Sequence, residues 1–225
     1  MNFFDRLKAE TESERQHLLS APLISAGLDG ETTVATYAAF LQQAYHHVCH
    51  TTPLLMAVGA RLPASKEWLR AAVASYIAEE LGHQEWILDD IEACGYSRET
   101  ARNSKPNFAT ELMVAYAYDT INRKNPVGFF GMVHVLEGTS IGIASAAADA
   151  LQGALKLPDS AFTYLRSHGA LDQDHVKFFE SLMNQIDDPA DQDSIIHCAR
   201  AFYRLYGDTL RSVSPADVAD SEIAA

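Results

Sequence analysis

Apolar residues recur at helical spacing along most of this chain, and this feature constrains the fold more than any other. Alternation of apolar and polar residues, which is typical of half-buried strands, is nearly absent. The chain has 225 residues, of which 48% are hydrophobic, so it can bury a sizeable core. No change in composition marks a domain boundary. We therefore predict a single all-α domain, built as a helical bundle.

Prolines, glycines and polar runs divide the chain into seven predicted helices. Pro53 should kink or split the second helix, Gly95 should end the third, and Pro126 lies near the start of the fifth. We expect residues 1–212 to form the domain and residues 213–225 to form a polar C-terminal tail. The predicted helices span approximately residues 3–19, 33–62, 65–93, 108–123, 126–155, 158–186 and 190–212.

The balance of charge and the cysteines restrict the partners and the cellular compartment. The formal net charge is -13, whereas nucleic acids and anionic membranes attract clusters of Lys and Arg, so neither is an expected partner. Cys49, Cys94 and Cys198 are widely spaced and form no CxxC pair, which favours a reducing compartment. No signal peptide or membrane-spanning apolar run is evident, and we predict a cytoplasmic protein.

The predicted helix over residues 158–186 carries three potential metal ligands. His168 and Asp172 are four residues apart, and Asp172 and His175 are three apart. On one continuous helix these steps place all three side chains on one face. Imidazole and carboxylate groups are preferred ligands of non-haem iron, manganese and zinc, so this face would form one wall of a metal site.

Two other predicted helices offer further ligands. Glu80 and His83 have the Glu-x-x-His spacing that di-metal carboxylate bundles use, and Glu80 is preferred to Glu79 as the inward carboxylate. Glu137 is the only acidic residue between Lys124 and Asp149, within an apolar helix. A carboxylate buried there must be paired, protonated or bound to metal.

Several other histidines fit less well as ligands. His46, His47 and His50 cluster on the second predicted helix, where they are expected to be core or supporting residues. His134 lies one turn before Glu137, which it is placed to orient. A second Glu-x-x-His match, at Glu14 in the first helix, lies among charged residues and is interpreted as a solvated face.

Together, three helices supply three carboxylates and three histidines, which is the set expected for two iron or manganese ions. The alternative is that all six groups are paired separately for structural reasons, which would be costly in a core without a shared cation. Glu80, Glu137, His168 and Asp172 are the candidate catalytic residues. The candidate metal ligands are Glu80, His83, Glu137, His168, Asp172 and His175.

This pattern resembles the haem-oxygenase-like di-iron oxidases, a family of iron-containing redox enzymes. The residues that carry the resemblance are Glu80 and His83 in Ala-Glu-Glu-Leu-Gly-His, Glu137 in Val-Leu-Glu-Gly, and the motif from His168 to His175. The wider superfamily includes thiaminase II (TenA) and pyrroloquinoline-quinone synthase (PqqC). The resemblance covers residues 30–210.

The resemblance implies a seven-helix bundle that forms a homodimer. It also implies two non-haem Fe(II) ions per chain, with manganese as the alternative metal, and activation of O2. The expected reaction is oxidation of a small organic substrate of the amino acid, amine or fatty acid type. We expect the apolar faces of the helices to line the substrate pocket, including Tyr116, Phe129, Met132 and Val133.

Three other interpretations stay open at the level of sequence. One is a metal-free enzyme of the TenA or PqqC type. A thiaminase of this type needs a nucleophilic cysteine, for which Cys49 and Cys198 are available. A haem-degrading enzyme would need a proximal histidine on the first helix, where only His17 occurs. The chain could also be a non-enzymatic metal-binding helical protein.

Overall fold

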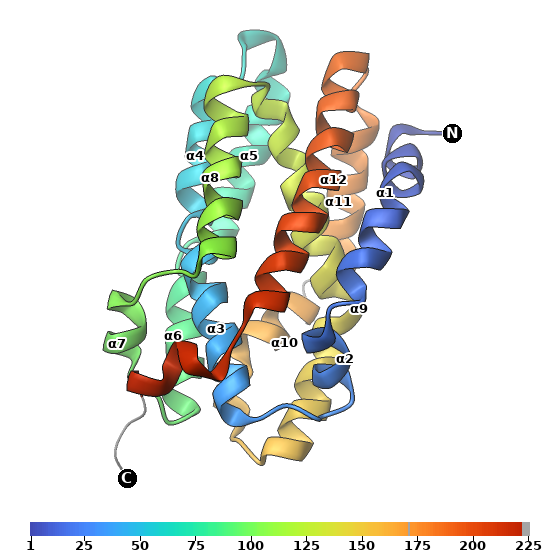
Figure 1. Ribbon diagram of the computed structural model, residues 1–225. Coiled ribbons are helices and arrows are strands. Elements are labelled where there is room, and N and C mark those ends of the chain that lie inside the picture. Colours follow the sequence, from blue (N-terminus) through green and yellow to red (C-terminus); the bar gives the residue numbers. More distant parts are fainter. Residues whose placement is uncertain (171, 222–225) are drawn as a thin grey trace.

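The structure, a computed structural model, describes the backbone of residues 1–170 and 172–221 and the side chains of residues 1–141, 143–167 and 176–218. These residues form an all-α bundle without β-strands, in which the longer helices run roughly along one axis (Figure 1). The predicted fold class is confirmed. The α-helices are α1 (Phe3–Leu19), α2 (Pro22–Leu28), α3 (Val34–Val48), α4 (Thr51–Arg61), α5 (Glu67–Glu80), α6 (His83–Ala93), α7 (Arg98–Asn103), α8 (Phe108–Arg123), α9 (Phe130–Leu155), α10 (Thr163–Ala170), α11 (Asp172–Asn184) and α12 (Pro189–Ser212).

Short 3-10 helices complete the bundle. They are η1 (Ala64–Lys66), η2 (Pro126–Phe129), η3 (Asp159–Ala161) and η4 (Pro215–Ser221). The last of these lies in the segment that the sequence assigns to a polar tail. Its Val218 is buried and belongs to the apolar cluster that also contains residues of α3. The chain therefore folds back onto the bundle after α12.

Three of the predicted helices are each divided in two. The second ends at Val48 and resumes at Thr51, which places Pro53 in the first turn of α4, where its missing N–H is tolerated. The third is interrupted at Gly82, whose φ of 93° lies in the left-handed region that glycine adopts readily. The sequence predicted the first break, from Pro53, but not the second, because helical spacing continues across Gly82.

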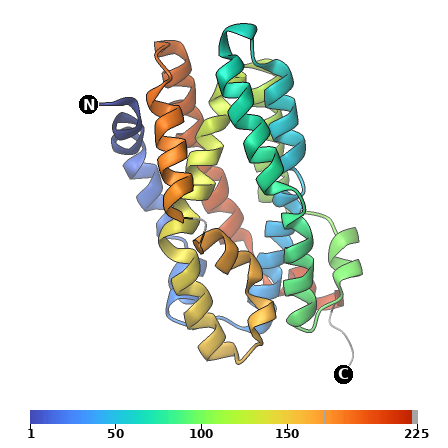
Figure 2. The same ribbon diagram turned by 180° about the vertical axis from the view of Figure 1, so that it is seen from behind.

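The third division corrects the prediction for the histidine motif. His168 belongs to α10, whereas Asp172 and His175 belong to α11, so the three residues do not lie on one continuous helix. Figure 2 shows the two helices as separate segments with different directions beside α9. Asp172, with which α11 begins, is a residue type favoured at helix N-termini, and this is the local signal for a second helix.

Helix α9 runs through both apolar clusters of the bundle. Its N-terminal half contributes Phe130 and Val135 to the cluster shared with α4, α8 and α12. Its C-terminal half contributes Ala148 and Leu151 to the cluster shared with α3, α6 and α10. No single helix among the described residues is long and apolar enough to span a membrane, although the bent pair Pro126–Ile141 and Ile143–Leu155 reaches that length and composition together.

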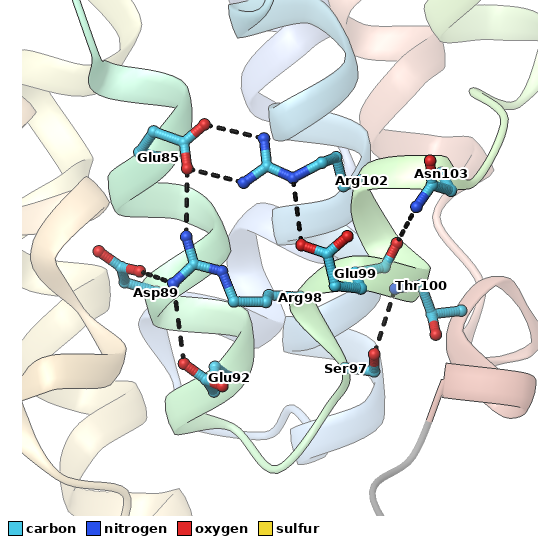
Figure 3. A network of polar contacts seen from close by, with 9 residues as sticks. All are labelled: Glu85, Asp89, Glu92, Ser97, Arg98, Glu99, Thr100, Arg102 and Asn103. Atoms are coloured by element: carbon cyan, nitrogen blue, oxygen red, sulfur yellow. Dashed lines mark hydrogen bonds and ion pairs between the residues drawn. The ribbon is translucent and has the colours of Figure 1, made fainter.

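A network of charged side chains joins α7 to α6 (Figure 3). Glu85 accepts hydrogen bonds from Arg102 at 2.8 and 2.9 Å and from Arg98 at 3.1 Å. Arg98 also donates to Asp89 at 2.7 Å. These groups are partly or fully exposed to solvent, so the pairs contribute little to the stability of the fold. The network fixes the position of α7 rather than the core.

The start of α10 is anchored by a buried carboxylate of α6. Asp90 is fully buried and accepts hydrogen bonds from the backbone N–H groups of Thr163, at 3.1 Å, and Tyr164, at 2.8 Å. The Thr163 hydroxyl donates to the same carboxylate. Tyr37 of α3 donates to the carbonyl oxygen of Ala161, at 2.8 Å. Asp90 thus caps the helix that carries His168.

We expect Asp90→Ala to lower the free energy of unfolding by about 2–4 kcal/mol, because buried N–H groups at the start of α10 lose their acceptor. Asp89→Ala is the matched control. Its side chain is 55% exposed and pairs with Arg98, so the loss should stay below about 1 kcal/mol. Urea unfolding monitored by circular dichroism measures both values. Equal losses in the two variants would contradict the anchoring role of Asp90.

Candidate functional site

A cavity of about 100 Å³ lies inside the bundle and contains two of the predicted carboxylates. We call it the carboxylate pocket. Glu80, at the end of α5, and Glu137, in α9, both line it, together with His47 of α3. The rest of its wall is mostly apolar or aromatic, and includes Leu55, Phe129, Met132, Val133 and Leu136.

Glu137 is half-buried on α9, in the wall of the carboxylate pocket. Burial raises the pKa of its carboxyl group from 4.5 to about 8, and the nearby carboxylates of Glu80 and Glu79 raise it further in the same direction. Among the described side chains, none donates a hydrogen bond to this carboxylate. Glu137 therefore holds a proton at neutral pH unless a cation binds beside it.

Tyr76 contributes a buried hydroxyl group to the same pocket. It lies one turn before Glu80 on α5 and is 3% exposed. Its hydroxyl group has no hydrogen-bond partner among the described residues. Burial raises the pKa of this phenol well above its usual value, and Glu137, Glu79 and Glu80 add to the effect. A neutral phenol without a partner is available to donate a hydrogen bond to a group bound in the pocket.

The break at Gly82 changes how Glu80 and His83 are related. They were predicted to project from one helix, but Glu80 ends α5 and His83 begins α6. They still meet, with 3.1 Å between the Nδ1 atom of His83 and the Oε2 atom of Glu80. The His83 ring is buried and stacks on Trp86 at 4.2 Å between ring centroids. His83 thus contacts the carboxylate pocket through Glu80. Glu79, the other carboxylate considered as the inward one, is exposed.

Of the three histidines in the second predicted helix, His46 and His50 contact hydroxyl groups of neighbouring helices or loops, and His47 lines the carboxylate pocket. His46 lies 2.8 Å from the hydroxyl of Ser104, and His50 lies 3.1 Å from the hydroxyl of Tyr118. His47 is buried, lines the carboxylate pocket, and makes an edge contact with Tyr206. Only His47 of the three therefore faces the candidate site.

A second cavity, of about 340 Å³, lies on the other side of Glu137 and also contains Lys8 and Arg15 of α1. His134 lines it and packs against Phe179 and Tyr203. Within the described part of the chain, His134 therefore contacts aromatic side chains rather than Glu137, and its Nε2 atom lies 3.4 Å from the Tyr203 hydroxyl. Burial lowers the pKa of the His134 imidazole to about 4, so this ring is neutral at pH 7.

His168, Asp172 and His175 have side chains that lie outside the described residues. Among the described side chains, no group of three or more His, Cys, Asp or Glu residues is arranged to hold a metal. The flanking residues do reach the cavities beside Glu137. Tyr164 lines the carboxylate pocket, and Val176 lines the second cavity. Helices α10 and α11 both pack against α9.

The predicted pocket residues Phe129, Met132 and Val133 line the carboxylate pocket, but Tyr116 does not. Tyr116 packs instead against Phe202, at 5.4 Å between ring centroids, because α8 presents this face to α12. Sequence reasoning also missed three tyrosines of the pocket wall, which are Tyr76, Tyr164 and Tyr206. Only Tyr76 had a signal in the sequence, namely its position one turn before Glu80.

The residues needed by the alternative interpretations lie away from this pocket. Burial raises the thiol pKa values of Cys49 and Cys198, which opposes their use as nucleophiles, and neither residue lines the carboxylate pocket. His17 of α1 is exposed and does not line the carboxylate pocket or the cavity on the other side of Glu137.

Comparison with known proteins identifies the class of protein. The chain belongs to the family of iron-containing redox enzymes, whose match covers residues 38–207, and this places it among the oxidoreductases. The resemblance on which the sequence prediction relied is thereby confirmed. Among curated proteins, none matches this sequence.

Similar solved structures share the haem-oxygenase-like fold. A domain of unknown function with this fold from Shewanella denitrificans OS217 is 26% identical, with a TM-score of 0.83 over 93% of this chain and 91% of that chain. The TenA homologue from P. horikoshii OT3 is 12% identical, with a TM-score of 0.76 over 95% and 98% of the two chains. Haem oxygenase-1 from Synechocystis sp. PCC6803, in complex with haem, is 12% identical, with a TM-score of 0.75 over 97% and 95%.

We expect Glu137→Gln to stabilise the metal-free protein at alkaline pH. The pKa of Glu137 is raised in the folded chain, so the folded state binds this proton more tightly than the unfolded state, and wild-type stability falls as pH rises from 4.5 to about 8. Glutamine removes this loss. The variant should therefore be more stable than the wild type by roughly 2–4 kcal/mol at pH 9 and about equal to it at pH 4.

Denaturant unfolding in the presence of a chelator, at several pH values, measures this difference. Asp149→Asn on the same helix is the matched control, because the Asp149 side chain is 70% exposed and pairs with Arg166 at the surface. Its effect should stay within about 0.5 kcal/mol across the same range. A Glu137→Gln effect that does not vary with pH would show that the carboxyl group is not buried as described.

Proposed function

We propose that this chain is a non-haem iron oxidoreductase that binds two iron ions and uses O2 to oxidise a small organic substrate. The observation that carries the proposal is that Glu80 and Glu137 face one cavity whose wall is otherwise mostly apolar. Glu137, whose pKa is raised by burial and by the nearby carboxylates, is stable there only if it is protonated or shares a cation. The family to which the chain belongs makes iron the expected cation.

The residues present fit an iron centre. Carboxylate oxygens and imidazole nitrogens form the mixed ligand set that iron prefers, and manganese accepts the same set. The unpartnered hydroxyl of Tyr76 and the raised pKa of Glu137 both point to a group that belongs in this cavity. In this proposal Glu80, Glu137, His168, Asp172 and His175 hold the metal.

His83 has a supporting role in the proposed centre. Its Nδ1 atom lies 3.1 Å from the Oε2 atom of Glu80, and its ring is held by stacking on Trp86. A histidine in this position orients the carboxylate, which keeps the other carboxylate oxygen directed at the pocket. We therefore assign His83 to the centre through Glu80.

The surrounding residues would prepare the pocket for oxidation chemistry. Bound iron supplies the capacity to reduce O2 when coordination positions remain open. The aromatic and aliphatic walls exclude water, which strengthens electrostatic interactions within the cavity. The neutral hydroxyl of Tyr76 would donate a hydrogen bond to a substrate bound in the pocket. Assembly as a homodimer and a cytoplasmic location remain predictions that follow from the family resemblance and from the sequence.

Anaerobic loading with Fe(II), followed by removal of unbound metal and analysis of iron per chain, tests this proposal. We expect about two irons in the wild type and none or one in Glu137→Ala and His168→Ala, because each change removes a ligand. His17→Ala, which alters an exposed histidine of α1, is the control and should bind as the wild type does. An absence of iron, or iron retained by both ligand variants, would contradict the proposal.

The role of His83 has its own test. We expect His83→Ala to weaken Fe(II) affinity about 10–100-fold without abolishing binding, as is typical when a residue that orients a ligand is removed. His50→Ala, in which a histidine bonded to Tyr118 is lost, is a comparison variant away from Glu80. Competition with a colorimetric chelator gives the affinities. Complete loss of iron in His83→Ala would instead make His83 a direct ligand.

A further inference from the structure

We propose that a third cavity, which is apolar and which we call the tail pocket, binds the uncharged tail of the substrate. The substrate would then carry an extended hydrocarbon chain. The tail pocket lies between α2, α3, α9, α10 and α12 and has a volume of about 100 Å³. That is several times the roughly 10–15 Å³ that a water-sized group requires. This inference rests on the proposed function for the identity of the reacting end, whereas the binding of the tail is independent of it.

The tail pocket adjoins the carboxylate pocket and shares part of its wall. Ser140, Tyr164 and Tyr206 line both cavities. The Ser140 hydroxyl donates to the carbonyl oxygens of its own helix, at Leu136 and Glu137, so it does not place an unsatisfied polar group at the junction. In this proposal a single ligand extends from one cavity into the other past these three side chains.

The composition of the tail pocket selects the chemistry of its occupant. None of its described lining residues is charged, and its wall includes Ile24, Phe40, Ile143, Leu165 and Leu210. A charged group placed there would lose its hydration without a partner, which is costly. A hydrocarbon chain, in contrast, gains free energy with each methylene that it buries.

The two pockets are arranged along one helix. Glu137 faces the carboxylate pocket, whereas Ala144 and Ala147 face the tail pocket, seven and ten residues further along α9. At about 1.5 Å per residue, these positions lie roughly 10 and 15 Å beyond Glu137. The occupant is therefore elongated. A free amino acid, which carries its ammonium and carboxylate groups on one carbon of a short skeleton, does not extend over this distance, and a long unbranched chain does.

A homologous series of uncharged n-alkanols, from hexanol to dodecanol, tests the tail pocket without depending on iron or on catalysis. Binding to the full chain is measured by isothermal titration calorimetry. We expect affinity to rise about fourfold for each added methylene, until the pocket is filled. Affinity that is unmeasurable, or that does not change with chain length, would overturn the proposal.

Two neighbouring alanines of α9 provide a matched pair of variants. Ala147→Leu adds bulk inside the tail pocket and should weaken binding of the longest alkanols at least tenfold. Ala146→Leu adds the same bulk at an exposed position and should leave binding unchanged. If Ala147→Leu does not fold, Ala144→Val places a smaller obstruction in the same pocket. Equal effects of Ala147→Leu and Ala146→Leu would overturn the assignment.

Iron counting on the same proteins separates this inference from the proposed function. Ala147→Leu should retain the iron content of the wild type, because the change lies in the tail pocket. Iron binding without alkanol binding would overturn the tail pocket and leave the metal centre in place. Alkanol binding without iron binding would overturn the metal centre and leave an apolar binding site.

Discussion

The close approach of α9 to α12 is the contact on which the rest of this bundle depends. A Cβ atom on Gly131 would lie 2.5 Å from both the backbone nitrogen of Ala199 and the backbone oxygen of Ile195, so only glycine allows this contact. At Gly128, in the preceding η2, a Cβ atom would lie 2.7 Å from the Ser194 hydroxyl oxygen and 2.9 Å from the Cys198 sulfur, which are side-chain atoms of α12. Because α9 passes through both apolar clusters and lines both the carboxylate pocket and the tail pocket, its position relative to α12 sets the geometry of the candidate site.

The electrostatic character of the site follows from that packing. A carboxylate at position 137 on a helix at the surface would be hydrated, but in the middle of this bundle its pKa is raised to about 8. Glu80 comes close enough to add to the shift because α5 ends beside the pocket, and Gly82 turns the chain so that His83 returns to Glu80. The same arrangement that destabilises an ionised Glu137 favours a bound cation.

The resemblance could be stated from the sequence because the motifs around Glu80, Glu137 and His168 are local and short. The family match confirmed the resemblance. The helix spans over 3–19 and 108–123 were also predicted correctly, since apolar spacing and capping residues are encoded within each segment. The division between α10, which carries His168, and α11, which begins at Asp172, was not predicted, because the helical spacing of the sequence continues through it. Likewise, the position of Tyr116 depended on which helix lies opposite α8.

The sequence by itself determined an acidic, all-α chain with carboxylate and imidazole groups on several helices, because helical period, caps and residue type are properties of short segments. The tertiary structure alone decided that Glu80 and Glu137 face one cavity and that His83 contacts Glu80 across a left-handed glycine. It also decided that a cavity without charged lining residues adjoins the carboxylate pocket. The reason is that side chains far apart in sequence meet only when helices pack, and the crossing of helices is set by the whole core rather than by any one segment.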